Sequence, residues 1–166
     1  PTVLSPEAAR QGLSRSLFER LLEAHPGIGR MLCEQHRMHE RIMAFPSREL
    51  YAGALRAHPD VAGHLLTDLE GVRGPGVELP VVFLDTAGKG FDDEAGEDGE
   101  SRRNPQEAAL VAERVRALLE AGLAPGQISV IAPYSAQVQL LRSTLPVPGL
   151  EIDTVDGFQG RENEAI

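Results

Sequence analysis

The hydrophobic and polar positions of the chain alternate with two periods, one typical of helices and one of strands. The most regular set predicts a helix that begins after Asn104, with Pro105 at its first position, Glu107 three residues after the cap and Gly122 just past its end. Apolar side chains recur along it every three or four residues. Further helices are predicted over residues 6–12, 16–24, 136–145 and 40–51, the last interrupted or kinked at Pro46.

Short continuous apolar runs predict strands that are covered on both faces. Such runs are residues 79–85 (LPVVFLD), 128–132 (ISVIA) and 150–155, with 30–35 as a shorter candidate. A long connection rich in glycine, proline and histidine is expected over 52–77. From residue 79 onward, strands and helices alternate. This order predicts an α/β fold with a parallel sheet between helices, with functional groups beyond the carboxyl ends of the strands.

Composition and charge narrow the class of protein. A chain of 166 residues with 42% hydrophobic residues fits a single domain with one core. The net charge of -9 argues against a simple basic module that coats DNA, so any contact with nucleic acid must be local. The lone Cys33 allows no internal disulfide and favours a reducing, cytoplasmic setting. We expect no metal site, and no segment reaches the roughly 20 apolar residues that cross a membrane.

Acidic residues are concentrated in residues 91–100, where six acids and two glycines occur in ten positions. We interpret residues 91–103 as a solvated acidic loop. A metal-binding segment is the alternative, although the spacing matches no calcium loop. Both ends of the chain are expected to be cuts within a longer protein, because residues 164–166 lead into an apolar strand without a terminator.

Three segments at or after predicted strand ends carry the chemistry: QHRMH at 35–39, APYSAQ at 132–137 and DTVDGFQGREN at 153–163. Together with LDTAG at 84–88 and AFPSRELYAG at 44–53, they resemble the second motor domain of the superfamily 1B helicases. This group contains the nonsense-mediated-decay helicase and the immunoglobulin mu-binding helicase. The resemblance implies a RecA-like three-layer sandwich with the P-loop NTPase fold. Residues 1–166 would be one partial domain, the second of the motor.

The resemblance also implies roles around a bound nucleotide. Arg37 would be the arginine finger, because a guanidinium stabilises the charge that spreads over a transferring phosphate and does not lose its proton. His36 stands where the family commonly has a tyrosine stacked on adenine; an ordinary strand-edge residue is the alternative. Gly160 would allow the backbone to approach a phosphate. Glu162 would organise the cleft or accept from a ribose hydroxyl, and an acid at a helix start is the alternative.

A second set of residues is assigned to single-stranded nucleic acid. Thr154 offers a hydroxyl and a neighbouring amide to a phosphate. Backbone amides and an aromatic ring at the end of the second strand could hold the strand; these residues are Pro133, Tyr134, Ser135 and Gln137. A ring packed beneath the helix is the alternative for Tyr134. Gln159 would couple the two ligand sites.

One expected motif is absent from the sequence. No G-x-x-x-x-G-K-[ST] segment is present to hold phosphates and magnesium. ATP and Mg²⁺ would therefore be bound mainly by an N-terminal RecA-like domain of the same parent chain, and the isolated chain should not hydrolyse ATP. The parent would be an ATP-dependent helicase acting on DNA or RNA. The alternatives are a non-catalytic module that binds nucleic acid or protein, and an unrelated doubly wound enzyme, for which we find no catalytic cluster.

Overall fold

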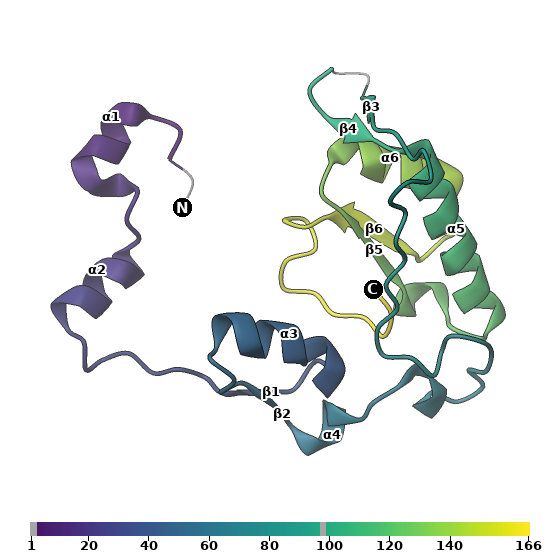
Figure 1. Ribbon diagram of the computed structural model, residues 1–166, viewed down its shortest axis with the longest axis horizontal. Helices are drawn as coiled ribbons and strands as arrows, with labels where there is room; N and C mark the ends of the chain where they lie inside the picture. Colours follow the sequence, from purple (N-terminus) through teal and green to yellow (C-terminus); the bar gives the residue numbers. More distant parts are fainter. Residues whose placement is uncertain (1–2, 97–98) are drawn as a thin grey trace. The chain divides into compact units, whose positions relative to one another are not determined.

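The computed structural model describes residues 3–96 and 99–166, which form two compact units (Figure 1). The first unit ends at Cys33 and the second comprises Glu34–Ile166. Of the helices in the described residues, none has both the length and the apolar composition required to cross a membrane.

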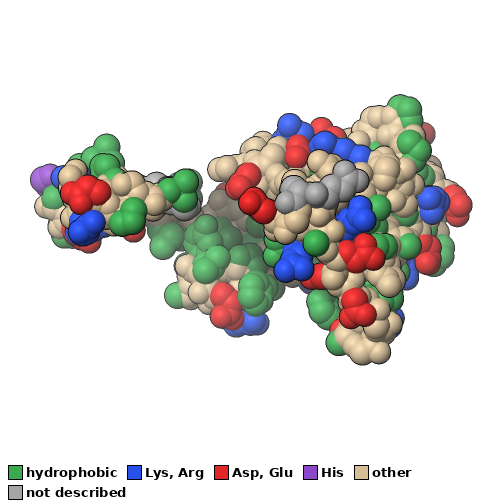
Figure 2. Space-filling model, turned by 90° about the horizontal axis from the view of Figure 1, so that it is seen from above, with side chains coloured by type: hydrophobic (Ala, Val, Ile, Leu, Met, Phe, Trp, Pro, Cys, Tyr) green, Lys and Arg blue, Asp and Glu red, His purple; other side chains and the backbone are tan. Residues whose placement is uncertain are grey.

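The first unit contains short helices: α1 (Pro6–Ala8), η1 (Ala9–Leu13) and α2 (Leu17–Ala24). They confirm the predictions over 6–12 and 16–24. Ser16 caps α2, since its hydroxyl accepts from the amide of Glu19 at 3.2 Å while the Glu19 carboxylate accepts from the amide of Ser16 at 2.6 Å. The pKa of Glu19 is lowered because its carboxylate accepts from the Ser16 amide, which has the larger effect, and from the Ser16 hydroxyl at 2.8 Å. Leu17 and Phe18 are exposed, and hydrophobic side chains are visible among the charged ones on the molecular surface (Figure 2).

The core of the second unit lies between two strands and two helices. The strands β5 (Ser129–Ala132) and β6 (Glu151–Thr154) are parallel neighbours, with Val130 opposite Ile152 and Ala132 opposite Thr154. Helices α5 (Pro105–Glu120) and α6 (Ser135–Thr144) pack with them, and η3 (Pro125–Gln127) leads into β5. Fully buried side chains here include Ala112, Ile128 and Leu141. The three predicted elements over 128–155 and the α5 helix are confirmed.

Helix α5 has the ends that its sequence predicts. The side chain of Asn104 accepts from the amide of Glu107 at 3.0 Å, which satisfies one of the free donors at the helix start. Gly122 follows the helix with φ of 109°, a left-handed conformation that glycine adopts without steric cost. A Cβ there would also lie 2.8 Å from the carbonyl oxygen of Gly71. Both the turn and the packing therefore require glycine.

The region after Cys33 is built from small elements: β1 (Glu34–Gln35), α3 (Glu40–Leu50), β2 (Arg56–Ala57), α4 (Pro59–Ala62) and η2 (Leu66–Asp68). Pro46 was predicted to interrupt or kink this helix; α3 continues through it, so the interruption is wrong, and a kink stays a prediction. The missing proline amide removes only one helical hydrogen bond. The predicted connection over 52–77 contains the strand β2 and the short helices α4 and η2. Strand β1 is much shorter than the 30–35 prediction.

The predicted acidic loop over 91–103 contains a short antiparallel strand pair. Strand β3 (Glu94–Ala95) pairs with β4 (Arg102–Arg103), so that Glu94 faces Arg103 with 3.5 Å between their charged groups. The opposite charges and the ladder hydrogen bonds stabilise this strand pair. Glu97 and Asp98 of the predicted loop lie outside the described residues.

The predicted buried strand over 79–85 is wrong for this chain. Its apolar side chains are exposed, with Phe83 at 87%, and no strand of the described residues pairs with it. On the edge of β5 that faces away from β6, Ala165 forms a parallel bridge with Ile128, and no further pairing is found there among the described residues. An apolar run becomes a buried strand only when neighbours satisfy its backbone. The described strands therefore form three separate pairs.

Candidate nucleotide and nucleic-acid sites

Two predicted site residues meet although 125 positions separate them in the sequence. The Nε atom of Arg37 donates to Oε2 of Glu162 at 2.6 Å. Both side chains are largely exposed, at 55% and 67%. The first and third motifs therefore lie side by side, and an arginine and a carboxylate from them share one open surface.

The turn that presents Arg37 is held by the side chain of Gln35, the last residue of β1. Oε1 of Gln35 accepts from the amides of Arg37 at 2.8 Å and Met38 at 2.7 Å, and its Nε2 donates to the carbonyl of Met38 at 2.7 Å. One side chain thus satisfies three backbone groups that a tight turn leaves without ladder partners. The QHRM segment is consequently held in one conformation and projects Arg37 outward.

The ring of His36 contacts a second imidazole as well as a carboxylate. Its ring stacks on that of His58, with centroids 4.2 Å apart and planes 23° apart, and its Nε2 lies 3.3 Å from Oε1 of Glu34. The side chain is 62% exposed. The ring that was predicted to stack on adenine therefore already stacks on an imidazole on one face.

The third motif follows β6 as a loop anchored by Phe158, which is buried. Gly160 has φ of 85°, and no atom lies within 4 Å of a Cβ built there, so its backbone faces open space. Gly157 is packed differently, because a Cβ there would overlap the carboxylate of Asp153. Gly157 was not among the residues predicted from the sequence. Gln159 is exposed on the same loop.

The residues predicted to contact nucleic acid lie at one edge of the β5 and β6 pair. Pro133 and Tyr134 follow β5, and Thr154 ends β6 opposite Ala132. Because the strands are parallel, these ends share an edge. The Tyr134 ring is 48% exposed, so it is only partly packed. The Thr154 hydroxyl accepts from the amide of Gly157 at 3.2 Å and keeps its own proton to donate.

The side chain of Gln137 joins two elements of the fold. Its side chain is buried, and its Oε1 accepts from the amide of Asn104 at 2.8 Å while its Nε2 donates to the carbonyl of Asn104 at 3.2 Å. It thereby joins α6 to the start of α5. The Gln137 side chain is therefore committed to buried backbone groups, and the contact of nucleic acid with the backbone amides of this segment stays a prediction.

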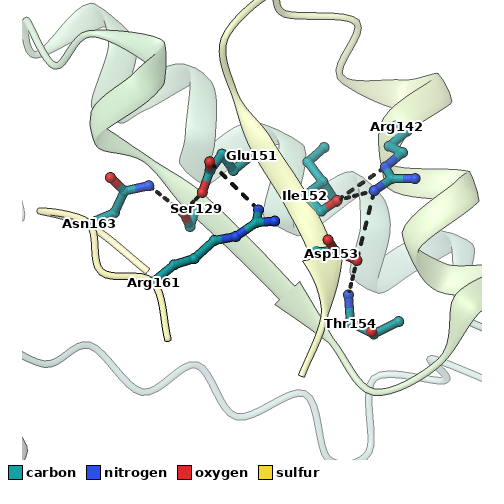
Figure 3. A network of polar contacts seen from close by, with 8 residues as sticks. All are labelled: Ser129, Arg142, Glu151, Ile152, Asp153, Thr154, Arg161 and Asn163. Carbon is teal, nitrogen blue, oxygen red and sulfur yellow. Dashed lines mark hydrogen bonds and ion pairs between the residues drawn. The ribbon is translucent and has the colours of Figure 1, made fainter. Parts of the chain in front are cut away.

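A polar network secures the third motif to the strands (Figure 3). Asn163 hydrogen-bonds the hydroxyl of Ser129, which donates to Glu151 at 3.4 Å, and Arg161 lies 3.7 Å from the same carboxylate. On the opposite side of β6, Arg142 donates twice to the carbonyl of Ile152, at 2.7 and 3.1 Å. The loop that carries Gly160 and Glu162 is thus tied down at both ends.

Comparisons with known proteins agree with this arrangement of motifs. A family model described as an AAA domain matches residues 13–166. The chain is 51% identical over its whole length to DNA-binding protein SMUBP-2 of Mus musculus, and covers 17% of that protein. It is 38% identical over 98% of its length to DNA polymerase alpha-associated DNA helicase A of Schizosaccharomyces pombe, covering 26% of it. It is 34% identical to the regulator of nonsense transcripts 1 homolog of Neurospora crassa, with the whole chain aligned to 16% of that protein.

The chain thus spans about a sixth to a quarter of the length of these relatives. The family match covers the whole second unit and the first unit from residue 13 onward, and the three motifs lie within it. The described strands, helices and parallel pairs are those of an α/β domain. The chain belongs to the AAA domain family, with the P-loop NTPase fold, and within it to the superfamily 1B helicase group.

Proposed function

We propose that this chain is the C-terminal RecA-like motor domain of an ATP-dependent superfamily 1 helicase. The observation that carries the proposal is the contact of Arg37 with Glu162, which joins the first and third motifs on one exposed surface. Relatives named as DNA helicases support an ATP-using parent. The domain would complete a nucleotide site whose phosphate-binding loop and magnesium ligands belong to an N-terminal RecA-like domain of the same parent.

Arg37 would act as the arginine finger. Its partnership with Glu162 does not prevent this, because an exposed ion pair contributes only about 0–1 kcal/mol. A nucleotide phosphate offers the guanidinium a doubly hydrogen-bonded, more highly charged partner. Glu162 would then hold Arg37 in place while the cleft is open and release it when a γ-phosphate arrives.

His36, Gly160 and Glu162 would form the remainder of the nucleotide side. Gly160 fits a phosphate oxygen, since its backbone faces open space and no side chain of its own intervenes. Glu162 offers its second carboxylate oxygen to a ribose hydroxyl. The exposed face of the His36 ring can receive a base.

Single-stranded nucleic acid would bind along the edge formed by Pro133, Tyr134 and Thr154. The net charge of the chain is -9, so a grip based on one aromatic ring and one hydroxyl suits it better than a basic groove. Gln159 lies on the loop between Thr154 and Gly160 and would couple the two ligands. We expect Thr154→Ala to weaken the stimulation of ATP turnover by nucleic acid, as measured in a titration with a single-stranded oligonucleotide.

ATPase activity of the full-length parent, measured beside this chain with single-stranded DNA and RNA in separate titrations, tests the proposal. Stimulated activity in the parent and none in the chain alone is the expected result. No activity in either protein would instead favour a non-catalytic module that binds nucleic acid or protein. That module retains the exposed edge at Tyr134, so oligonucleotide binding without ATP turnover would identify it.

A further inference from the structure

Three side chains at the start of the second unit form a cluster with metal-ligating chemistry. Glu34, His36 and His58 each place one ligand atom so that all three atoms lie within 4.8 Å of one another. Glu34 and His36 are exposed and His58 is half-buried. Two imidazoles with one carboxylate are a ligand set that zinc accepts in three-residue sites.

The backbone places the two histidines side by side. Strands β1 and β2 are parallel, with Gln35 opposite Ala57, and the amide of His58 continues the ladder by donating to the carbonyl of Gln35 at 2.9 Å. His36 and His58 each follow a paired residue, so they leave the ladder together. Their stacked rings, with centroids 4.2 Å apart, result from this register. The cluster therefore depends on the backbone and not on a chance meeting of long side chains.

The separations of the ligand atoms suit a small ion. The Nε2 atom of His36 lies 3.3 Å from Oε1 of Glu34. Two ligands of a tetrahedral ion with bonds of about 2.0–2.1 Å lie about 3.3 Å apart. The exposed side chains of Glu34 and His36 can turn without moving a packed neighbour, and the half-buried His58 ring must turn out of its stack on His36 for its ring nitrogen to face the same ion.

Asp60 supplies the orienting partner that metal-bound histidines have. The Nδ1 atom of His58 lies 3.4 Å from Oδ2 of Asp60 and 3.3 Å from the backbone amide of the same residue. In the metal-free chain Nδ1 accepts from that amide, so an ion at Nε2 requires the proton to move to Nδ1, where the ring donates to the Asp60 carboxylate in place of the capping bond. A carboxylate that holds a histidine in this tautomer raises its basicity as a ligand.

We propose that Glu34, His36 and His58 bind one Zn²⁺-class divalent ion, with Asp60 as the positioning residue for His58 and a fourth position open to water. The ion joins the end of β1 to the start of α4, two segments that otherwise meet through a two-residue ladder. An ion that binds the folded chain alone also stabilises it, in proportion to the logarithm of the free ion concentration above its Kd.

Isothermal titration of the metal-free chain with Zn²⁺, and of the same chain with Co²⁺ followed by visible absorption, tests the site. All proteins carry Cys33→Ser, which removes the lone thiol as a competing ligand. The expected result is one ion per chain and the intense absorption of four-coordinate Co²⁺. His36→Ala and His58→Ala should each abolish both signals, and Asp60→Asn should weaken binding by about 10–100-fold.

His64→Ala is the matched control. His64 also has two carboxylate neighbours, but Glu164 lies 2.9 Å from its Nε2 and Asp68 lies 3.6 Å from its Nδ1, so they face opposite ring nitrogens and do not converge. His64→Ala should bind Zn²⁺ as tightly as the chain that carries Cys33→Ser alone. Because His58 also caps α4, the exposed His36 gives the more direct test, and circular dichroism checks each fold. Absence of binding, or binding unaffected by His36→Ala, would overturn the proposal.

Discussion

Replacing Gln137 by alanine is expected to lower the free energy of unfolding by about 1–3 kcal/mol, the cost of leaving one buried polar group without a partner. Gln137 makes two hydrogen bonds to the backbone of Asn104, which is 3% exposed. The carbonyl of Asn104 also accepts from the amide of Ala108 at 3.0 Å, so it keeps one partner in the variant. The amide of Asn104 has no other partner among the described residues, so the loss of its hydrogen bond sets the expected decrease in the free energy of unfolding.

Urea unfolding of the chain, followed by circular dichroism, measures this difference at constant slope. Gln139→Ala is the control, because Gln139 lies on the same helix and is exposed. Its effect should stay within about 0.5 kcal/mol, as is usual for surface substitutions. A water molecule admitted beside Asn104 would move the loss towards the lower end of the range. Equal stability of the two variants would refute the assignment of Gln137 as the link between α6 and α5.

Other expected outcomes concern the third motif and the helix ends. Gly157→Ala should destabilise the chain by about 0.5–1.5 kcal/mol, because the Asp153 carboxylate must turn away from the new methyl group and give up its hydrogen bond from the amide of Thr154; thermal unfolding measures this, and a variant as stable as the unaltered chain contradicts the packing. Asn104→Ala removes the cap of α5 and should cost about 0.5–2 kcal/mol in the same assay, whereas no loss would exclude the capping role. The pKa of Glu19 is lowered in the folded state, so its capping contribution is present above the ordinary carboxyl pKa and is lost as pH falls through the lowered value. Far-UV circular dichroism should therefore show helix loss on acidification that Glu19→Gln reduces, and an unchanged acid transition would contradict it.

Features determined by local sequence could be predicted. Helix α5 begins after Asn104 and is followed by Gly122 because capping and left-handed turns depend on residues within a few positions. The pairing of β5 with β6 followed from two apolar runs around a helix of ordinary length. For the same reason the fold class and the shared edge at Tyr134 and Thr154 were accessible before the structure.

Features determined by contacts between distant residues could not be predicted. The run over 79–85 has the composition of a buried strand, but burial depends on neighbours that its own sequence does not reveal. Strand β2 is two residues long, which is too short for a periodic signal in the sequence. Because β2 could not be predicted, the stacking of His36 on His58 could not be predicted either. The link from the Gln137 side chain to Asn104 could not be predicted either, because a resemblance gives a residue's place in a motif and not its hydrogen bonds. Only the family resemblance placed Arg37 and Glu162 at the same nucleotide site.

The central claim is that Arg37 completes a nucleotide site on a partner domain, and ATP turnover by the Arg37→Ala parent tests it most directly. Arg48→Ala, which changes another exposed arginine, is the control. The Arg48→Ala protein should hydrolyse ATP at nearly the rate of the unaltered full-length protein. If Arg37 is the arginine finger, its replacement should lower kcat by about 10³-fold or more, as for other arginine fingers, and leave nucleotide affinity unchanged. Unchanged turnover, or a loss of nucleotide affinity equal to the loss of rate, would contradict it.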